Sequence, residues 1–420
     1  MKLLYFNPDR GIPVLGDKGA SVHVRAFVEA ARRLGHEVAL VCTARGAGNP
    51  PPDALLIELA PATSPAALEA LCAERGLALP FLEDPVARRE LARIAHDRAL
   101  VHAVPAALAR AGFQPDMIYE RHALFHSSGV AIARALDLPR VLEVNAPLIV
   151  EQRRFRGLVF EDAARAAEAA SYRGADAILT VSDAVADQVR LVLGRDAGER
   201  VRVVPNGVDP DRFQPDVGRA TMRARLGLGA APTIGFFGSF KPWHGIAMLG
   251  EVFRALAVTH PAARLLAVGE GPEHAAFRDG LGAAGLADRL VLPGRVPHAE
   301  VPAWLAACDL TIAPYLPQQD FYFSPLKVVE SLAAGRPVVA PALGQLTTLI
   351  DDGINGRLYR PGDAGDCLRA LGDLIDDPAA RAAMGRAAHR RSAGFGWARI
   401  VADALALGAA LAGRQPAWPA

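Results

Sequence analysis

Short apolar runs alternate with amphipathic stretches along most of the chain. The first run, KLLYFN, is followed by the loop PDRGIPVLGDKGAS, by a stretch with apolar residues at spacings of three and four, and by the run EVALVC. Such spacings predict a helix, and the short apolar runs predict buried strands. The start of the chain is therefore interpreted as a β-loop-α-β unit.

This order of elements recurs in two blocks. The first continues with the runs DMIYER, RVLEVN, AILTVS and RVRVVP, and the second contains TIGFFG, ARLLAVGEG, RLVLPG, LTIAPY and RPVVAP. Strands separated by helices predict parallel sheets with both faces covered. Residues 45–110 are rich in turns before a long helical stretch, and we interpret them as an extended crossover of the first block.

The blocks meet at VVPNGVDPDRFQPD, whose Pro, Asn, Gly and Asp residues are typical of a connector. We predict an α/β protein of two Rossmann-like, doubly wound domains, residues 1–205 and 206–395, that face each other across a cleft. A long helix at about 396–415, anchored by Trp397, is expected to pack back on the first domain. Ligands of such folds bind at the carboxyl ends of the strands, so the candidate residues are sought there.

Charge and composition narrow the range of partners. The chain has 46 basic and 45 acidic residues, a net charge of +1, so no overall field attracts a nucleic acid. Its four cysteines are isolated, without metal-site spacing, and no signal peptide or membrane-spanning run is visible. We expect a cytoplasmic protein without a metal site. Peripheral contact with the inner face of a membrane stays open, and the oligomeric state is not indicated.

The segment SPLKVVESLAAG predicts a helix with a cation near its start. Ser324 is the expected N-cap, and Lys327 then stands at the third helical position, where a cation costs about 0.3–1 kcal/mol unless an anion offsets it. We expect the helix start, with Leu326 and Lys327, to bind a diphosphate and Glu330 to bind a ribose. The alternative is an ion pair between Lys327 and Glu330.

Two other loops offer candidate groups for the same ligand. Gly238, Ser239, Lys241 and His244 lie in FFGSFKPWHGI, where glycine allows close approach and the other side chains bring charge or protons. The alternative is an ordinary turn with an exposed Lys and His. Gly19, just before the first helix, offers a backbone amide. The segment VGEGPEH lacks the third glycine of a dinucleotide fingerprint and is weak support for NAD.

Polar residues cluster at two predicted strand ends of the first domain. Arg121 and His122 end one strand, and Asn145 follows another. Clusters of this kind suggest acceptor binding or catalysis. A single histidine at a strand end is more often a hydrogen-bonded structural residue.

Together these segments resemble retaining glycosyltransferases of the GT-B fold, in the large family four. The resemblance runs from GDKGASVHVRAFVEAARRLGHEV through VPNGVD, FFGSFKPWHG, AVGEGPE and SPLKVVESLAAGRPVVA to FGWARI. It implies an enzyme that binds a nucleotide sugar in the C-terminal domain. The sugar would pass with retention, without a metal ion or other cofactor, to a hydroxyl of a carbohydrate, lipid-linked or small-molecule acceptor in the N-terminal domain.

The resemblance also assigns roles to individual residues. Glu330 matches the second glutamate of the family's E-x7-E motif, whereas Tyr322 stands in place of the first, so sugar recognition would rely on backbone groups or on neighbours such as Asp320. In the G-R-x-x-x-x-K-G loop, Ser239 and His244 replace the two cations, and we infer that Lys241 and Lys327 take over. The family's histidine beside the sugar falls at Arg121 or His122. Backbone groups of Arg295 and Val296 are candidates for contact with the base.

Three alternatives remain. A nucleotide-sugar epimerase shares the fold and donor site but needs no acceptor. An NAD-dependent oxidoreductase is disfavoured because no complete glycine fingerprint is present. A noncatalytic sugar- or nucleotide-binding protein would tolerate replacement of the polar strand ends. The base, sugar, acceptor and linkage are not indicated by the sequence.

Overall fold

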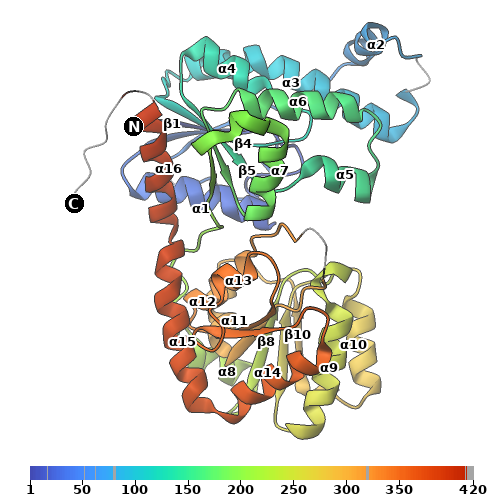
Figure 1. Ribbon diagram of the computed structural model, residues 1–420, viewed down its shortest axis with the longest axis vertical. Helices are drawn as coiled ribbons and strands as arrows, with labels where there is room; N and C mark the ends of the chain where they lie inside the picture. The colour runs from blue at the N-terminus through green and yellow to red at the C-terminus, as the bar shows by residue number, and fades with distance from the viewer. Residues whose placement is uncertain are drawn as a thin grey trace. The chain divides into compact units, whose positions relative to one another are not determined.

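The computed structural model describes residues 1–16, 18–51, 53–61, 63–78, 82–317, 321–411 and 413. The chain divides into two compact units, and each contains one parallel sheet (Figure 1). The prediction of an α/β protein with two parallel-sheet domains is therefore confirmed.

The sheet of the first unit has the strand order β3-β2-β1-β4-β5-β6-β7, and its neighbouring strands run parallel. The order reverses between β1 and β4, so the chain leaves these two strands in opposite directions at their carboxyl ends. The strands are β1 (Lys2–Asn7), β2 (Glu37–Cys42), β3 (Leu55–Glu58), β4 (Met117–Arg121), β5 (Arg140–Val144), β6 (Ala177–Thr180) and β7 (Val201–Val203).

Alternate side chains of this sheet pack against helices on opposite faces. Leu4 and Ile118 belong to the core shared with α3 and α4, whereas Tyr5 and Tyr119 pack on Phe27 of α1, with ring centroids 5.3 and 4.2 Å away. The helices are α1 (Gly19–Arg33), α2 (Pro65–Glu74), α3 (Pro85–Arg110), α4 (Ser128–Leu136), α5 (Leu148–Arg156), α6 (Glu161–Arg173) and α7 (Asp183–Leu193), with the 3-10 helix η2 (Gly194–Arg200).

The extended crossover contains two elements that the apolar pattern did not reveal. One is the edge strand β3, which pairs with β2, and the other is α2, which packs on α3. β3 has only four residues, none of them buried, so its sequence lacks the apolar run of a central strand. The predicted long helix of this region is present as α3.

The last helix of the chain, α16 (Trp397–Leu411), belongs to the first unit. It packs on α1 and β5, and the ring of Trp397 meets that of His23 edge-on, with centroids 4.7 Å apart. Residues 412 and 414–415 of the expected helix lie outside the described residues.

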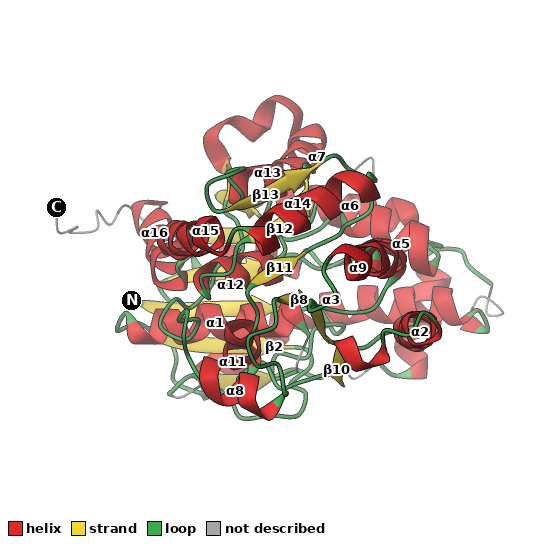
Figure 2. Ribbon diagram, turned by 90° about the horizontal axis from the view of Figure 1, so that it is seen from below, coloured by secondary structure: helices red, strands yellow, loops and turns green. Residues whose placement is uncertain are grey.

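The sheet of the second unit has the order β10-β9-β8-β11-β12-β13, also with parallel neighbours (Figure 2). β13, a short edge strand, was not predicted. The strands are β8 (Thr233–Phe237), β9 (Arg264–Val268), β10 (Leu290–Gly294), β11 (Leu310–Ile312), β12 (Val338–Pro341) and β13 (Gly356–Tyr359).

Helices cover both faces of this sheet as well. Phe236 packs with α9, α10 and α14, and its neighbour Phe237 with α11 and α12. The helices are α8 (Arg219–Arg225), α9 (Ile246–Thr259), α10 (His274–Ala283), α11 (Val301–Ala307), α12 (Leu326–Ala333), α13 (Leu346–Leu349), α14 (Ala364–Asp376) and α15 (Pro378–Ser392), with the 3-10 helices η3 (Pro242–His244), η4 (Ala287–Arg289) and η5 (Ala393–Phe395).

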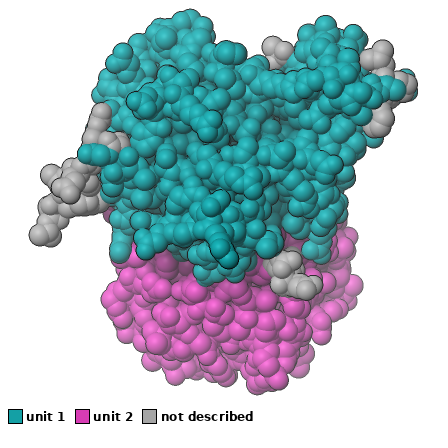
Figure 3. All heavy atoms as spheres, turned by 45° about the horizontal axis from the view of Figure 1, so that its top comes forward, with its two compact units in different colours: residues 1–205, 397–420 teal, residues 206–396 magenta. Residues whose placement is uncertain are grey.

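Figure 3 colours the two units, Met1–Pro205 with Trp397–Ala420 and Asn206–Gly396. The chain thus passes from one unit to the other after Pro205 and returns after Gly396. Among the described residues, no helix combines the length and apolar character needed to cross a bilayer.

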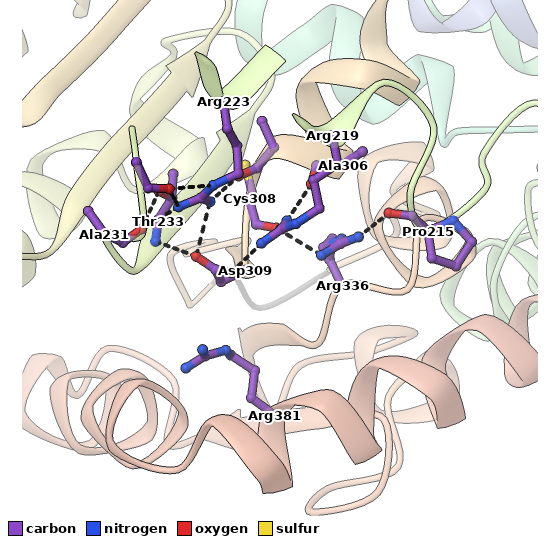
Figure 4. A network of polar contacts seen from close by, with 12 residues as sticks. Pro215, Arg219, Arg223, Ala231, Thr233, Ala306, Cys308, Asp309, Arg336 and Arg381 are labelled. Atoms are coloured by element: carbon purple, nitrogen blue, oxygen red, sulfur yellow. Dashed lines mark hydrogen bonds and ion pairs between the residues drawn. The ribbon is translucent and has the colours of Figure 1, made fainter. Parts of the chain in front are cut away.

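Three arginines near the amino-terminal ends of β8 and β11 serve the fold of the second unit (Figure 4). Arg219 and Arg223 pair with Asp309 at 2.7 and 3.4 Å, and Arg336 donates to the Cys308 carbonyl at 3.0 Å. These contacts tie α8 and the segment after α12 to the end of α11. Because ligands of doubly wound sheets bind at the opposite edge, this arginine cluster is structural.

Candidate active site

The start of α12 holds a buried cation without a partner. Nζ of Lys327 is shielded from solvent and has no hydrogen bond or ion pair among the described residues. It lies between the rings of Phe236 and Tyr315, 4.8 Å from each centroid. Burial lowers the pKa of Lys327 to about 7. Near pH 7 the amino group is therefore only partly protonated, and among the described residues it lacks the anion that would normally accompany a buried charge.

Two glycines bring neighbouring loops against this ammonium. Gly238, directly after β8, has a φ of +147°, and a Cβ on it would lie 2.8 Å from Lys327 Nζ. Gly269, after β9, has a φ of +137°, and a Cβ there would lie 1.9 Å from the Gly238 carbonyl oxygen. A side chain at Gly269 would require the loops to move, and one at Gly238 would strain the backbone and displace the Lys327 amino group.

His244 lies beside the cation but does not add to its charge. Its Nδ1 is 2.6 Å from the Ser239 carbonyl oxygen and 3.2 Å from Ser239 Oγ. Burial, followed by the charge of Lys327, lowers the pKa of His244 to about 3, although the Ser239 carbonyl opposes this. The imidazole is neutral at pH 7, so His244 offers a hydrogen bond and not a positive charge.

Glu330 and Lys327 do not form an ion pair with each other. The alternative interpretation of Lys327 as the partner of Glu330 is therefore wrong. Oε1 of Glu330 lies 2.7 Å from Nε2 of His298, a residue of the loop between β10 and α11. The carboxyl is one turn from Lys327 along α12, and Glu330 is 8% exposed. Sequence reasoning missed His298 because the two residues belong to different elements.

The expected N-cap of α12 is wrong. The helix starts at Leu326, with Pro325 at the cap and no side-chain cap. Ser324 Oγ instead accepts a hydrogen bond from the backbone N of Asn206, 2.9 Å away. Ser324 thus anchors the connector that opens the unit, while the N–H groups of Leu326 and Lys327 precede the first bond of the helix, which Val328 N donates to the Pro325 carbonyl.

The other predicted donor residues of this unit lie at loop ends. Lys241 is exposed, with Nζ 4.8 Å from the centre of the Trp243 ring. Arg295 is exposed, and Val296 packs on the core beneath it. Tyr322 packs on Phe323 with ring centroids 4.4 Å apart, and Asp320 lies outside the described residues. No role in sugar recognition follows from these positions alone.

In the first unit, Glu143 at the end of β5 is the centre of a buried polar cluster. Its carboxylate is 2.6 Å from His23 Nε2 and accepts hydrogen bonds from Tyr119 Oη and Arg121, each at 3.0 Å. Burial alone would raise the pKa of Glu143, but His23, Arg121 and Asn145 outweigh it and lower the pKa to about 2. Arg121 is therefore held in an ion pair inside the unit.

His122 points to a different environment from Arg121. Its ring is 5.1 Å from that of Tyr172 on α6, and its Nε2 is 3.7 Å from Glu168 Oε2, beyond hydrogen-bond distance. Both ring nitrogens are buried without a hydrogen-bond partner among the described residues, as is Asn145 Nδ2. Buried polar atoms of native proteins are normally paired, so the His122 ring at the carboxyl end of β4 keeps hydrogen-bonding capacity for a ligand, whereas Asn145 already interacts with Glu143.

Gly19 is the first residue of α1, whose first turn has no acidic residue and no side-chain cap. It belongs to the first unit, whereas the other predicted donor residues belong to the second.

Within the described residues, no group of three or more His, Cys, Asp or Glu side chains has the arrangement of a metal site. Metal independence stays a prediction.

The polar groups at the carboxyl edges of the two sheets differ in chemistry. The second unit combines a lysine amino group without a hydrogen bond or ion pair among the described residues, the start of α12 and a carboxylate one turn on, which suits an anion joined to a hydroxyl-bearing group. The first unit offers the His122 ring, whose nitrogens have no hydrogen bond among the described residues, which suits a hydroxyl-bearing ligand. Each set of groups stands at the carboxyl edge of its own sheet.

Comparison with family models accounts for most of both units. Residues 231–377 match the model described as glycosyl transferases group 1, and residues 18–212 match glycosyltransferase family 4. The chain is 31% identical over 317 residues to D-inositol 3-phosphate glycosyltransferase 1 of Catenulispora acidiphila, which covers 72% of this chain and 74% of that relative. It is 32% identical over 222 residues to 2-deoxystreptamine glucosyltransferase of Streptomyces kanamyceticus. This match covers 51% of this chain and 55%, or about half, of that relative.

Solved structures share the fold of the whole chain. Anabaena HepE in complex with UDP has a TM-score of 0.69 at 20% identity, covering 96% of this chain and 98% of its own. Sucrose-phosphate synthase from Thermosynechococcus elongatus has a TM-score of 0.71 at 20% identity, covering 98% and 99%. At this level of identity the likeness concerns the fold.

Proposed function

Because this chain belongs to the family 4 glycosyltransferases, we propose that it moves a sugar from a nucleotide diphosphate sugar to a hydroxyl acceptor, with retention and without a metal ion. The second unit would hold the nucleotide sugar and the first unit the acceptor. The resemblance of the motifs in both units supports this division of labour.

The observation that carries the proposal is the unpaired ammonium of Lys327. A buried cation without a counter-ion is costly to the fold, which suggests that its partner arrives with the substrate. Gly238 carries no side chain beside the amino group, where a Cβ would lie 2.8 Å from Lys327 Nζ. When the sugar departs, negative charge builds up on the diphosphate, and Lys327 with the N–H groups of the helix start would stabilise it.

The proposed acceptor side rests on the unpaired groups of the first unit. His122 and Asn145 would accept from, or donate to, the hydroxyls of a carbohydrate, a lipid-linked sugar or a small polar molecule. The relatives named for inositol phosphate and for 2-deoxystreptamine are consistent with a small polyhydroxylated acceptor.

Nucleotide preference is the first test. Binding of uridine, guanosine, adenosine and thymidine diphosphates would be measured by calorimetry, starting with UDP, which the Anabaena structure contains. The selected nucleotide sugar would then be offered with and without acceptor candidates. The proposal expects transfer that depends on an acceptor and withstands EDTA, with an unchanged anomeric configuration by proton NMR. Release of an epimerised nucleotide sugar without acceptor would instead support an epimerase.

Replacement of Glu330 by alanine is expected to weaken binding of the nucleoside diphosphate by about ten-fold or more, because a carboxylate hydrogen bond to the ribose is lost. Affinity for inorganic pyrophosphate, which has no ribose, should stay within about two-fold of the wild type. Calorimetry with both ligands provides the measurement. Glu251→Ala, at an exposed position of α9, is the matched control. An equal loss for both ligands would show that Glu330 does not contact the ribose.

A further inference from the structure

Glu330 is a carboxylate in an apolar part of its helix. Its neighbours Val328, Val329 and Leu332 are fully buried, and Glu330 itself is nearly so. A buried carboxylate needs hydrogen bonds or a cation to remain charged and fixed in orientation. Lys327, the cation nearest in sequence, lies between Phe236 and Tyr315 and does not serve this purpose.

His298 supplies the contact. It comes from the loop between β10 and α11 and places Nε2 2.7 Å from Oε1 of Glu330. The ring of Phe213 lies beside the imidazole, with centroids 6.0 Å apart. The hydrogen bond of the Glu330 carboxylate among the described residues involves Oε1, and 11% of its side chain is exposed. The histidine thus occupies one carboxylate oxygen and leaves the other available.

We propose that His298 is a positioning residue for the donor ribose. By holding Oε1 it fixes the plane of the carboxylate, so that Oε2 faces the ribose and accepts a hydrogen bond from its 2′-hydroxyl. Without the histidine, the carboxylate rotates and the ribose loses an oriented acceptor. The arrangement selects ribonucleotides over 2′-deoxyribonucleotides. This inference rests on the proposed function, in which Glu330 contacts the ribose.

The test compares the wild type with His298→Ala and His298→Gln. Calorimetry would use UDP, 2′-deoxy-UDP and inorganic pyrophosphate. His298→Ala is expected to weaken UDP binding by about ten-fold or more, the range for losing a hydrogen bond to a charged group. The preference for UDP over its deoxy form should shrink, while pyrophosphate affinity stays within about two-fold. Glutamine keeps a donor near Oε1, so His298→Gln should recover much of the preference.

A double-mutant cycle separates positioning from direct contact. If His298 acts through Glu330, His298→Ala combined with Glu330→Ala should bind UDP as Glu330→Ala does. His260→Ala is the matched control, because His260 also faces a carboxylate, Asp376 at 3.1 Å, at the far end of α9. That variant should bind all three ligands as the wild type does.

The outcomes distinguish this inference from the function on which it rests. If the wild type binds none of the tested diphosphates, the proposed function is overturned. If Glu330→Ala loses UDP selectively but His298→Ala does not, only the positioning role is overturned. Additive losses in the double variant, or equal losses of UDP and pyrophosphate in His298→Ala, would also overturn it.

Discussion

Replacement of Lys327 by methionine is expected to stabilise the second unit while removing most of its affinity for nucleoside diphosphates. Methionine has a similar length and fits between Phe236 and Tyr315 without a buried charge. The lowered pKa shows that burial disfavours the charged form, so the fold gains when the charge is removed. The gain should be about 1–3 kcal/mol, or some 2–4 °C of thermal midpoint per kcal/mol.

The loss of binding should be larger than at any other donor residue. A charge-assisted contact to a phosphate contributes about 1.5–3 kcal/mol, which corresponds to roughly ten- to one-hundred-fold in affinity. Thermal unfolding and calorimetry on the same variant measure the two effects. Lys241→Met, at an exposed lysine of the neighbouring loop, is the control and should leave stability unchanged. Unchanged nucleotide affinity in Lys327→Met would rule out the diphosphate assignment.

Because of the lowered pKa of Lys327, both the nucleotide affinity and the stability gain of Lys327→Met are expected to depend on pH. A bound diphosphate favours the ammonium, so affinity should be highest below pH 7 and should fall as the pH rises above it. A nucleotide sugar is the better ligand for this measurement, because its esterified phosphates do not titrate in this range. The stability gain of the methionine variant should be complete below pH 7 and should disappear towards pH 10.5, where the unfolded lysine also loses its proton.

Replacement of His122 by alanine is expected to reduce turnover by about a hundred-fold or more, the range for a group that hydrogen-bonds or moves a proton in the transition state. Its two ring nitrogens are buried at the end of β4 without a partner among the described residues, so they are available to a substrate. Donor affinity should change little, because the donor is proposed to bind the other unit. Steady-state kinetics for the acceptor, with calorimetry for the donor, separates the two quantities.

The control for His122 is His102→Ala on the exposed side of α3, which should turn over as the wild type does. His122→Gln should retain part of the activity if hydrogen bonding matters more than proton transfer. Wild-type turnover in His122→Ala would move the catalytic role to Asn145, which follows the end of β5. Arg121 is the weaker candidate, since its guanidinium is already bound to Glu143.

The fold could be predicted from sequence because central parallel strands are buried on both faces and appear as apolar runs. The two missed strands, β3 and β13, lie at sheet edges and are four residues long, so burial leaves little trace in their sequences. The helix α2 was missed for a related reason, since only Leu68, Leu71 and Cys72 are buried.

The candidate site was only partly predictable. Lys327 could be found because a cation at a helix start conflicts with the helix dipole. Its surroundings could not, because Phe236 lies far from Lys327 in the sequence and meets it only after folding. The same holds for Ser324, which bonds to Asn206, and for Glu330, which meets His298. Local sequence rules predict that a residue caps a helix or forms an ion pair. The partner that its side chain contacts in the folded protein depends on which distant elements pack against it.

The return of α16 to the first unit makes the two units unequal as modules for protein engineering. Asn206–Gly396 is one uninterrupted segment, so it can be exchanged between family members as a cassette with a single cut at each end. The first unit consists of two segments, and deleting the second would remove Trp397 from His23, the residue that faces Glu143. A chimera with a new first unit must therefore take both of its segments from the same parent.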